Sequence, residues 1–126
     1  MKTKPAWVIR KNRRYKVVTA DLCSVCHPSW RWNVSGNRSV GQVLQYKIGQ
    51  VKRSPNGVDM NNNITCARGI HAYTDYKSAR GYHHCCGCAR KIIVVYAPKW
   101  YGHYGAGKQR ASQIYVSSVS RQVLCK

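Results

Sequence analysis

The stretch Lys91-Ile92-Ile93-Val94-Val95-Tyr96 decides the fold class, because it is the strongest strand signal in the chain. Four consecutive β-branched residues favour extended backbone, and an unbroken apolar run indicates a strand buried on both faces. A second strand is predicted over residues 114–119, with Ile114 and Val116 facing one way and Tyr115 the other. We therefore expect a mainly β fold, a small β-sheet domain.

Other elements follow outward from these strands. The alternation of Leu44, Tyr46 and Ile48 predicts a strand over residues 43–51. Thr74 and Gly81 are suitable as the start and stop signals of one short helix over residues 75–80. The sequence therefore predicts several strands and a single short helix.

The N-terminal residues 1–20 are predicted to form a basic arm or strand. Two short apolar stretches, Trp7-Val8-Ile9 and Tyr15-Lys16-Val17-Val18, indicate either a hairpin-like pair or an arm that ends in a strand. At 126 residues the chain suits one domain. We expect residues 21–126 to form a single small β-rich domain.

The charge of the chain is far from balanced. Lys and Arg number 22 against three acidic residues, which gives a formal net charge of +19. A small domain needs only about 2 to 8 net charges for solubility, and a larger excess repels itself and destabilises the fold. The composition therefore predicts an anionic partner, either a nucleic-acid backbone or an anionic protein surface in a larger assembly.

Basic residues gather in short clusters, and tyrosine and tryptophan are frequent, as is common at interfaces. Arg31 lies between two tryptophans, which is typical of a base-stacking surface. The candidate residues for binding nucleic acid or another anionic partner are Lys11, Arg13, Arg14, Arg31, Lys52, Arg53, Lys108 and Arg110, with Trp30 and Trp32 as aromatic contacts.

The cysteines form two groups that resemble the halves of a zinc site. Cys23-x-x-Cys26 has the usual two-residue gap, and Cys85-Cys86-x-Cys88 forms a cysteine-rich knuckle. A tetrahedral structural zinc takes four such thiolates, so we predict zinc on Cys23, Cys26, Cys85 and Cys88, with Cys86 as an alternative to Cys85. Free buried thiols and disulfides remain the alternative interpretations.

The sequence predicts that the protein is not an enzyme. It has no glutamate, and Asp21, Asp59 and Asp75 share no spacing suited to paired-carboxylate or two-metal chemistry. Residues 102–108 lack the spacing and the hydroxyl of a phosphate-binding loop. Cys66 and His71 would be a weakly supported nucleophile and base.

Two stretches of the chain carry a resemblance to a known family. Residues 46–53 and 64–73, which include Cys66, Gly69 and His71, resemble a small domain of unknown function of large DNA viruses and phages, often found beside pentapeptide repeats. Its hallmark is C-x-x-G-[IF]-H followed by a helix with Ala and Tyr, and the resemblance extends with gaps over residues 42–119. This chain departs from the pattern in keeping only Asp75 as an acidic residue in the helix, and in its added cysteine knuckle.

The resemblance implies a virus particle as the setting. We expect a virion-associated structural protein, a minor capsid-type component that binds capsid or other virion proteins, packaged genome, or both. The alternative is a zinc-stapled module that binds DNA or RNA without enzymatic activity. No secretory signal is evident and no apolar run approaches the roughly 18 residues of a membrane span, so an intracellular location is expected outside the virion.

Overall fold

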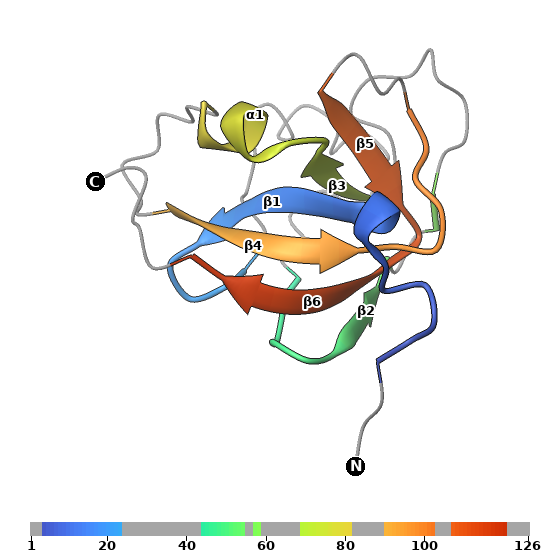
Figure 1. The fold of residues 1–126 in the computed structure, drawn as a ribbon. Coiled ribbons are helices and arrows are strands. Elements are labelled where there is room, and N and C mark those ends of the chain that lie inside the picture. Colours follow the sequence, from blue (N-terminus) through green and yellow to red (C-terminus); the bar gives the residue numbers. More distant parts are fainter. Residues whose placement is uncertain are drawn as a thin grey trace, which may run out of the picture.

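One antiparallel sheet of six strands organises the computed structural model, which describes residues 4–23, 44–54, 57–58, 69–81, 90–102 and 107–120. The strands follow the order β2-β6-β4-β1-β3-β5 across the sheet (Figure 1). Their bounds are β1 Arg13–Thr19, β2 Val51–Arg53, β3 Ile70–Tyr73, β4 Arg90–Tyr96, β5 Lys108–Ala111 and β6 Gln113–Val119; the helices are the 3-10 turn η1 Arg10–Asn12 and α1 Tyr76–Arg80. The mainly β fold with one short α-helix is confirmed.

The sequence stretch that decides the fold occupies the middle of this sheet. β4 pairs with β1 along its whole length, from Arg13 opposite Tyr96 to Thr19 opposite Arg90. On its other side β4 pairs with β6, with a bulge between Val94 and Val95. The predicted strands over residues 91–96 and 114–119 are therefore confirmed, and both neighbours of β4 are long strands that cover its backbone groups.

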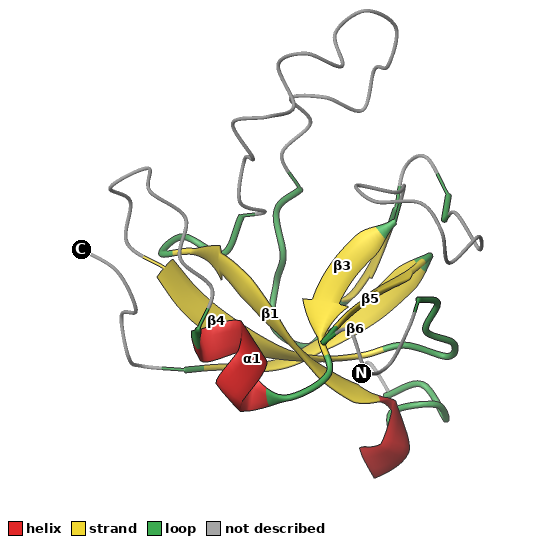
Figure 2. Cartoon of the chain, turned by 90° about the horizontal axis from the view of Figure 1, so that it is seen from above, coloured by secondary structure: helices red, strands yellow, loops and turns green. Residues whose placement is uncertain are grey.

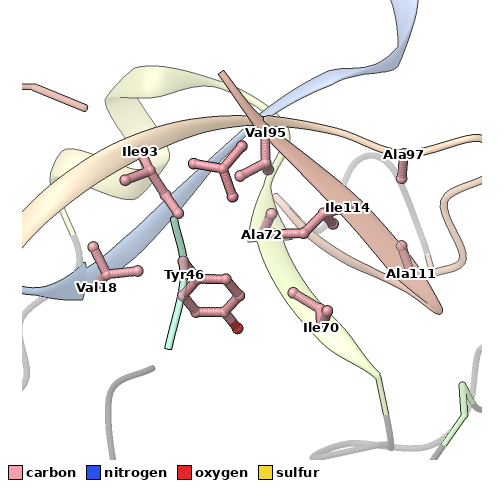
Figure 3. Packing of buried hydrophobic residues seen from close by; sticks show 10 residues of the cluster. Val18, Tyr46, Ile70, Ala72, Ile93, Val95, Ala97, Ala111 and Ile114 are labelled. Carbon is pink, nitrogen blue, oxygen red and sulfur yellow. The ribbon is translucent and has the colours of Figure 1, made fainter. Parts of the chain in front are cut away.

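The sheet has an inner and an outer face, which the strand register defines. Ile93 and Val95 of β4 point to the inner face, where the larger hydrophobic cluster lies (Figure 3). Ile92 points to the outer face and packs with Val17 and with Ala79 of α1, which lies against that side of the sheet (Figure 2). The expected burial of β4 on both faces is thus confirmed. The inner cluster comprises Val18, Tyr46, Ile70, Ala72, Ile93, Val95, Ala97, Ala111, Ile114 and Val116.

The prediction of a strand over residues 43–51 is wrong. Gln50 donates its backbone N–H to the Lys47 carbonyl in a turn, and Gly49 has a φ of +82°, which extended backbone does not adopt. Tyr46 instead places its ring inside the inner cluster (Figure 3), whereas Ile48 is 51% exposed. Of the described residues 44–51, only Val51 belongs to a strand, as the first residue of β2.

The short helix is confirmed, with its N-cap one residue later than expected. The Asp75 side chain, rather than that of Thr74, accepts a hydrogen bond from the Ser78 backbone N–H at 2.7 Å. In the N-terminal arm, Trp7 to Ile9 lie outside any strand, whereas Arg13 to Thr19 form β1. Of the two interpretations, the arm that ends in a strand is therefore the one observed. β3 and β5 were not predicted. Within the described residues, no helix has the length and apolar character needed to cross a membrane.

Candidate functional site

The strands of the sheet carry basic residues and no acidic ones. Nine of their residues are Lys or Arg, three on β1 and two each on β2, β4 and β5. β3 and β6 contribute no charged residue. An unbalanced positive charge is therefore built into the central element of the fold as well as into its loops.

Three of the predicted basic residues lie unburied on the outer face. Arg13 is directly opposite Tyr96, Arg53 is opposite Gln113, and Lys108 is opposite Tyr73. Directly paired residues of an antiparallel sheet share a face, so these side chains lie on the side where α1 packs. They come from the middle and from both edges of the sheet.

Other predicted basic residues lie elsewhere because neighbours on a strand alternate in direction. Arg14 and Lys52 are opposite Val95 and Ile114, which places them on the inner side. The Nε of Arg14 donates to Oε1 of Gln109 at 2.8 Å, and its guanidinium lies 5.5 Å from the centre of the Trp100 ring. The pairs Arg13–Arg14 and Lys52–Arg53 are thus divided between two faces. Lys11 is exposed in η1, and Arg110, two residues from Lys108 on β5, belongs to the outer face but is buried.

A lysine that the sequence analysis did not single out is buried at the inner face. Lys16 is 9% exposed, its Nζ donates to the His71 carbonyl at 2.7 Å, and it lies 5.6 Å from the centre of the Tyr46 ring. Burial, and to a smaller extent the charge of Lys108, lowers the pKa of Lys16 to about 7. Burial also raises the pKa of the Tyr46 hydroxyl. Lys16 therefore has a structural role at the inner face and is not a contact for a partner.

Four tyrosines cross the outer face, one on each of four adjacent strands. Tyr115 of β6 is opposite Tyr96 of β4, and Tyr15 of β1 is opposite Tyr73 of β3. We call these four residues the tyrosine stripe. All four are half-buried. The sequence alone predicted only that Tyr115 and Ile114 point in opposite directions. The alignment of the four tyrosines depends on the strand order, which the sequence did not predict.

The two described carboxylates accept hydrogen bonds from uncharged groups. The Thr19 hydroxyl donates to Asp21 and lowers the pKa of that carboxyl. The Ser78 backbone N–H does the same for Asp75 at the start of α1. These two carboxylates therefore serve a loop and a helix end.

Only Cys23 of the predicted zinc ligands lies within the described residues. Its thiol donates to Oε1 of Gln45 at 3.1 Å, and Cys23 and Gln45 form an isolated β-bridge. Within the described part of the chain no group of three or more His, Cys, Asp or Glu side chains could hold a metal ion. The zinc site stays a prediction. Outside the described residues lie Cys26, Cys85, Cys86 and Cys88, and also Trp30, Arg31, Trp32 and Cys66.

Two residues of the family motif have defined places at β3. Gly69 precedes the strand with a φ of +132°, and a Cβ there would lie 3.0 Å from Cγ2 of Val58. His71 is half-buried and opposite Arg110, and its backbone carbonyl accepts a hydrogen bond from Nζ of Lys16. The glycine at position 69 therefore has a structural explanation beside β3, whereas the described contact of His71 uses its backbone carbonyl.

Comparison of the chain with family models, with curated proteins and with solved structures found no match. The resemblance to a viral domain consequently stays a prediction.

Proposed function

We propose that this protein binds nucleic acid without catalysing a reaction, through phosphate contacts made by the outer face of its sheet. The observation that carries the proposal is that the strands carry nine basic and no acidic residues, of which Arg13, Arg53 and Lys108 lie unburied on the outer face. A phosphate backbone would neutralise this charge and release its own counterions, which drives binding.

The outer face supports this function because its basic residues are spread across it. Arg53 and Lys108 lie at opposite edges of the sheet, and Arg13 lies between them. Lys77 and Arg80, both exposed, belong to α1, which packs on the same side. A polyanion that runs across the strands would meet positive charge at each end and in the middle of its path.

The virion-associated structural role inferred from the resemblance stays a prediction. A virion protein that binds the packaged genome would combine the structural role with nucleic-acid binding. Contact with capsid proteins would instead use several separate surfaces, and basic residues such as Lys4, Lys47 and Lys99 are exposed outside the strands.

Salt dependence of binding tests the proposal. Fluorescence anisotropy with labelled oligonucleotides, between 50 and 300 mM salt, should give a log–log slope of about −5 for duplex DNA if six phosphates are neutralised. A flat salt response, or no binding at low salt, would contradict nucleic-acid binding.

A matched pair of triple variants locates the contact. Changing Arg13, Arg53 and Lys108 to Gln removes three outer-face charges, and changing Lys4, Lys47 and Lys99 to Gln removes three exposed charges outside the strands. The first variant should reduce the magnitude of the slope by about 3, since each phosphate contact contributes about 0.9, and the second by less. Equal losses would show that charge alone, wherever it lies, governs binding.

A further inference from the structure

We infer that the outer face binds single-stranded nucleic acid in preference to duplex, with bases stacked on Tyr96 and Tyr115. This inference rests on the proposed function and specifies its ligand. It follows from the places of the tyrosine stripe and of the basic residues beside it.

Tyr96 and Tyr115 are neighbours on β4 and β6, two adjacent strands of the sheet. They are directly opposite on β4 and β6, so they share the outer face, and both are half-buried rather than enclosed. Neighbouring strands lie about 4.8 Å apart, so the two side chains leave the sheet at adjacent points, and we call the surface that they form the platform. Every base has a π-face, so such a platform accepts bases without regard to sequence.

Positive charge borders this pair on both sides along the same face. Arg13 is opposite Tyr96 on β1. On the other side β2 follows, with Val51 opposite Tyr115 and Arg53 two residues further along the strand. Val51 is 41% exposed, so this edge of the platform is accessible. Bases stacked on the two tyrosines would have arginines within reach of the phosphates that precede and follow them.

The other half of the tyrosine stripe has a structural use. Tyr15 and Tyr73 pack against the outer cluster beneath α1. Tyr15 meets the Tyr76 ring edge-to-face, with centroids 5.8 Å apart, and the Lys108 ammonium lies 5.9 Å from the centre of the Tyr73 ring. These contacts assign Tyr15 and Tyr73 to holding α1 on the sheet, and they leave Tyr96 and Tyr115 as the stacking pair.

A single strand fits this surface better than a duplex does. In a duplex the bases are already stacked and paired inside, so exposed rings gain nothing from them. A sheet face with two or three aromatic side chains binds two or three unstacked bases in known RNA-binding modules. RNA and single-stranded DNA share this chemistry.

The experiment compares affinities of the full chain for a labelled 20-nucleotide dT strand, the corresponding rU strand and a 20-base-pair duplex, at one salt concentration. The wild type should bind both single strands more tightly than the duplex. Tyr96→Leu and Tyr115→Leu should each weaken single-strand binding roughly ten- to a hundredfold and change duplex binding little. Trp7→Leu, a half-buried aromatic residue outside the strands, is the control and should leave both affinities unchanged.

The possible failures are distinguishable. No salt-sensitive binding to any of the three ligands overturns the proposed function itself. Equal binding to strand and duplex, or undiminished binding by the Tyr96→Leu and Tyr115→Leu variants, overturns the stacking inference and leaves phosphate binding standing.

A second measurement needs no variant, in case either substitution prevents folding. Ultraviolet cross-linking of the wild type to the rU strand, followed by peptide mass spectrometry, should label the peptides that contain Tyr96 and Tyr115. Cross-links confined to other peptides would overturn the inference. A preference for rU over dT would identify RNA as the ligand, and the reverse order would identify single-stranded DNA; either supports the stacking model.

Discussion

The two faces of the sheet use the same strands for different purposes. The inner face is aliphatic, and Ile93, Val95 and Ile114 are fully buried around the ring of Tyr46 (Figure 3). The outer face carries half-buried tyrosines with basic residues beside them, and only a small buried cluster beneath α1. The inner face therefore supplies the stability that a highly charged chain needs, and the outer face is available for a partner.

The largest expected effect comes from breaking the inner face. Ile93→Ala should lower the free energy of unfolding by about 4 kcal/mol, because it leaves a cavity among residues held by five strands and by Tyr46. Chemical denaturation at neutral pH measures this change.

Ile92→Ala is the matched control on the outer face. Ile92 is as buried as Ile93, but among the described residues its cluster contains only two further buried residues, one of them on the five-residue helix α1. A short helix can move to fill part of the cavity, so we expect a loss of about 2 kcal/mol. Equal losses at the two positions would show that the faces contribute equally to stability.

The next prediction concerns the charge buried in the inner face. The pKa of Lys16 is about 7 in the folded protein, against a usual value of 10.5. Between these values the unfolded chain binds the additional proton, so the free energy of unfolding should rise with pH from about 7 toward 10. The rise should be on the order of a few kcal/mol.

Lys16→Met should remove this pH dependence. The methionine also leaves the His71 carbonyl without the Lys16 donor, so the slope of stability against pH is the informative measurement, rather than its value at one pH. Urea unfolding at pH 6, 7.5 and 9 gives that slope. Lys47→Met, at an exposed site, is the control. If the free energy of unfolding changes with pH equally in the wild type and in Lys16→Met, the lowered pKa of Lys16 is contradicted.

A smaller effect is expected where β3 enters the inner face. Gly69→Ala should lower stability by more than about 1 kcal/mol, because φ is +132° and the new Cβ would meet Val58 at 3.0 Å and the Ala111 carbonyl at 3.3 Å. Gly57→Ala has a φ of +74° and nothing within 4 Å, so it isolates the backbone strain. If thermal unfolding shows the same loss for both, the close contact at Gly69 has no energetic weight.

The smallest effect should come from the helix on the outer face. Asp75→Ala removes the N-cap of α1 and should increase hydrogen exchange in residues 76–80, with little change in the strands. The pKa of Asp75 is lowered by the Ser78 backbone N–H. Its contribution is therefore present above the usual carboxyl pKa and is lost as pH falls through the lowered value. A uniform change across the whole sheet would contradict a local role.

The sequence was sufficient for elements with a strong local signal. β4 and β6 follow from runs and alternations of apolar residues, and α1 from its start and stop residues. β5 was missed, since Gln109 and Arg110 are polar yet buried, and burial of polar residues depends on distant partners such as Arg14. β3 was missed because its four residues are too few to give a distinct alternating pattern. The strand over residues 43–51 was wrong because Tyr46 is buried as an isolated anchor, which imitates an alternating pattern.

The composition predicted that the protein has an anionic partner, but it did not predict which residues form the binding surface. The charge excess indicated an anionic partner, but the clusters around Arg13 and Lys52 are divided between faces by the alternation of strand residues. The tyrosine stripe brings together residues from four separate stretches, and only the order β6-β4-β1-β3 aligns them. That order is set by long-range pairing, which no local pattern encodes.

The place of β1 also determines when this protein can fold. Arg13 pairs with Tyr96, so β1, which is made before the other strands of this sheet, must wait for the synthesis of β4 before its principal neighbour exists. At about 5 to 20 residues per second that delay is roughly 4 to 17 seconds, and pairing between strands so distant is itself slow. Nascent chains therefore pass through a period in which a strongly cationic and partly apolar segment has no neighbour, and chaperone demand should be highest during synthesis.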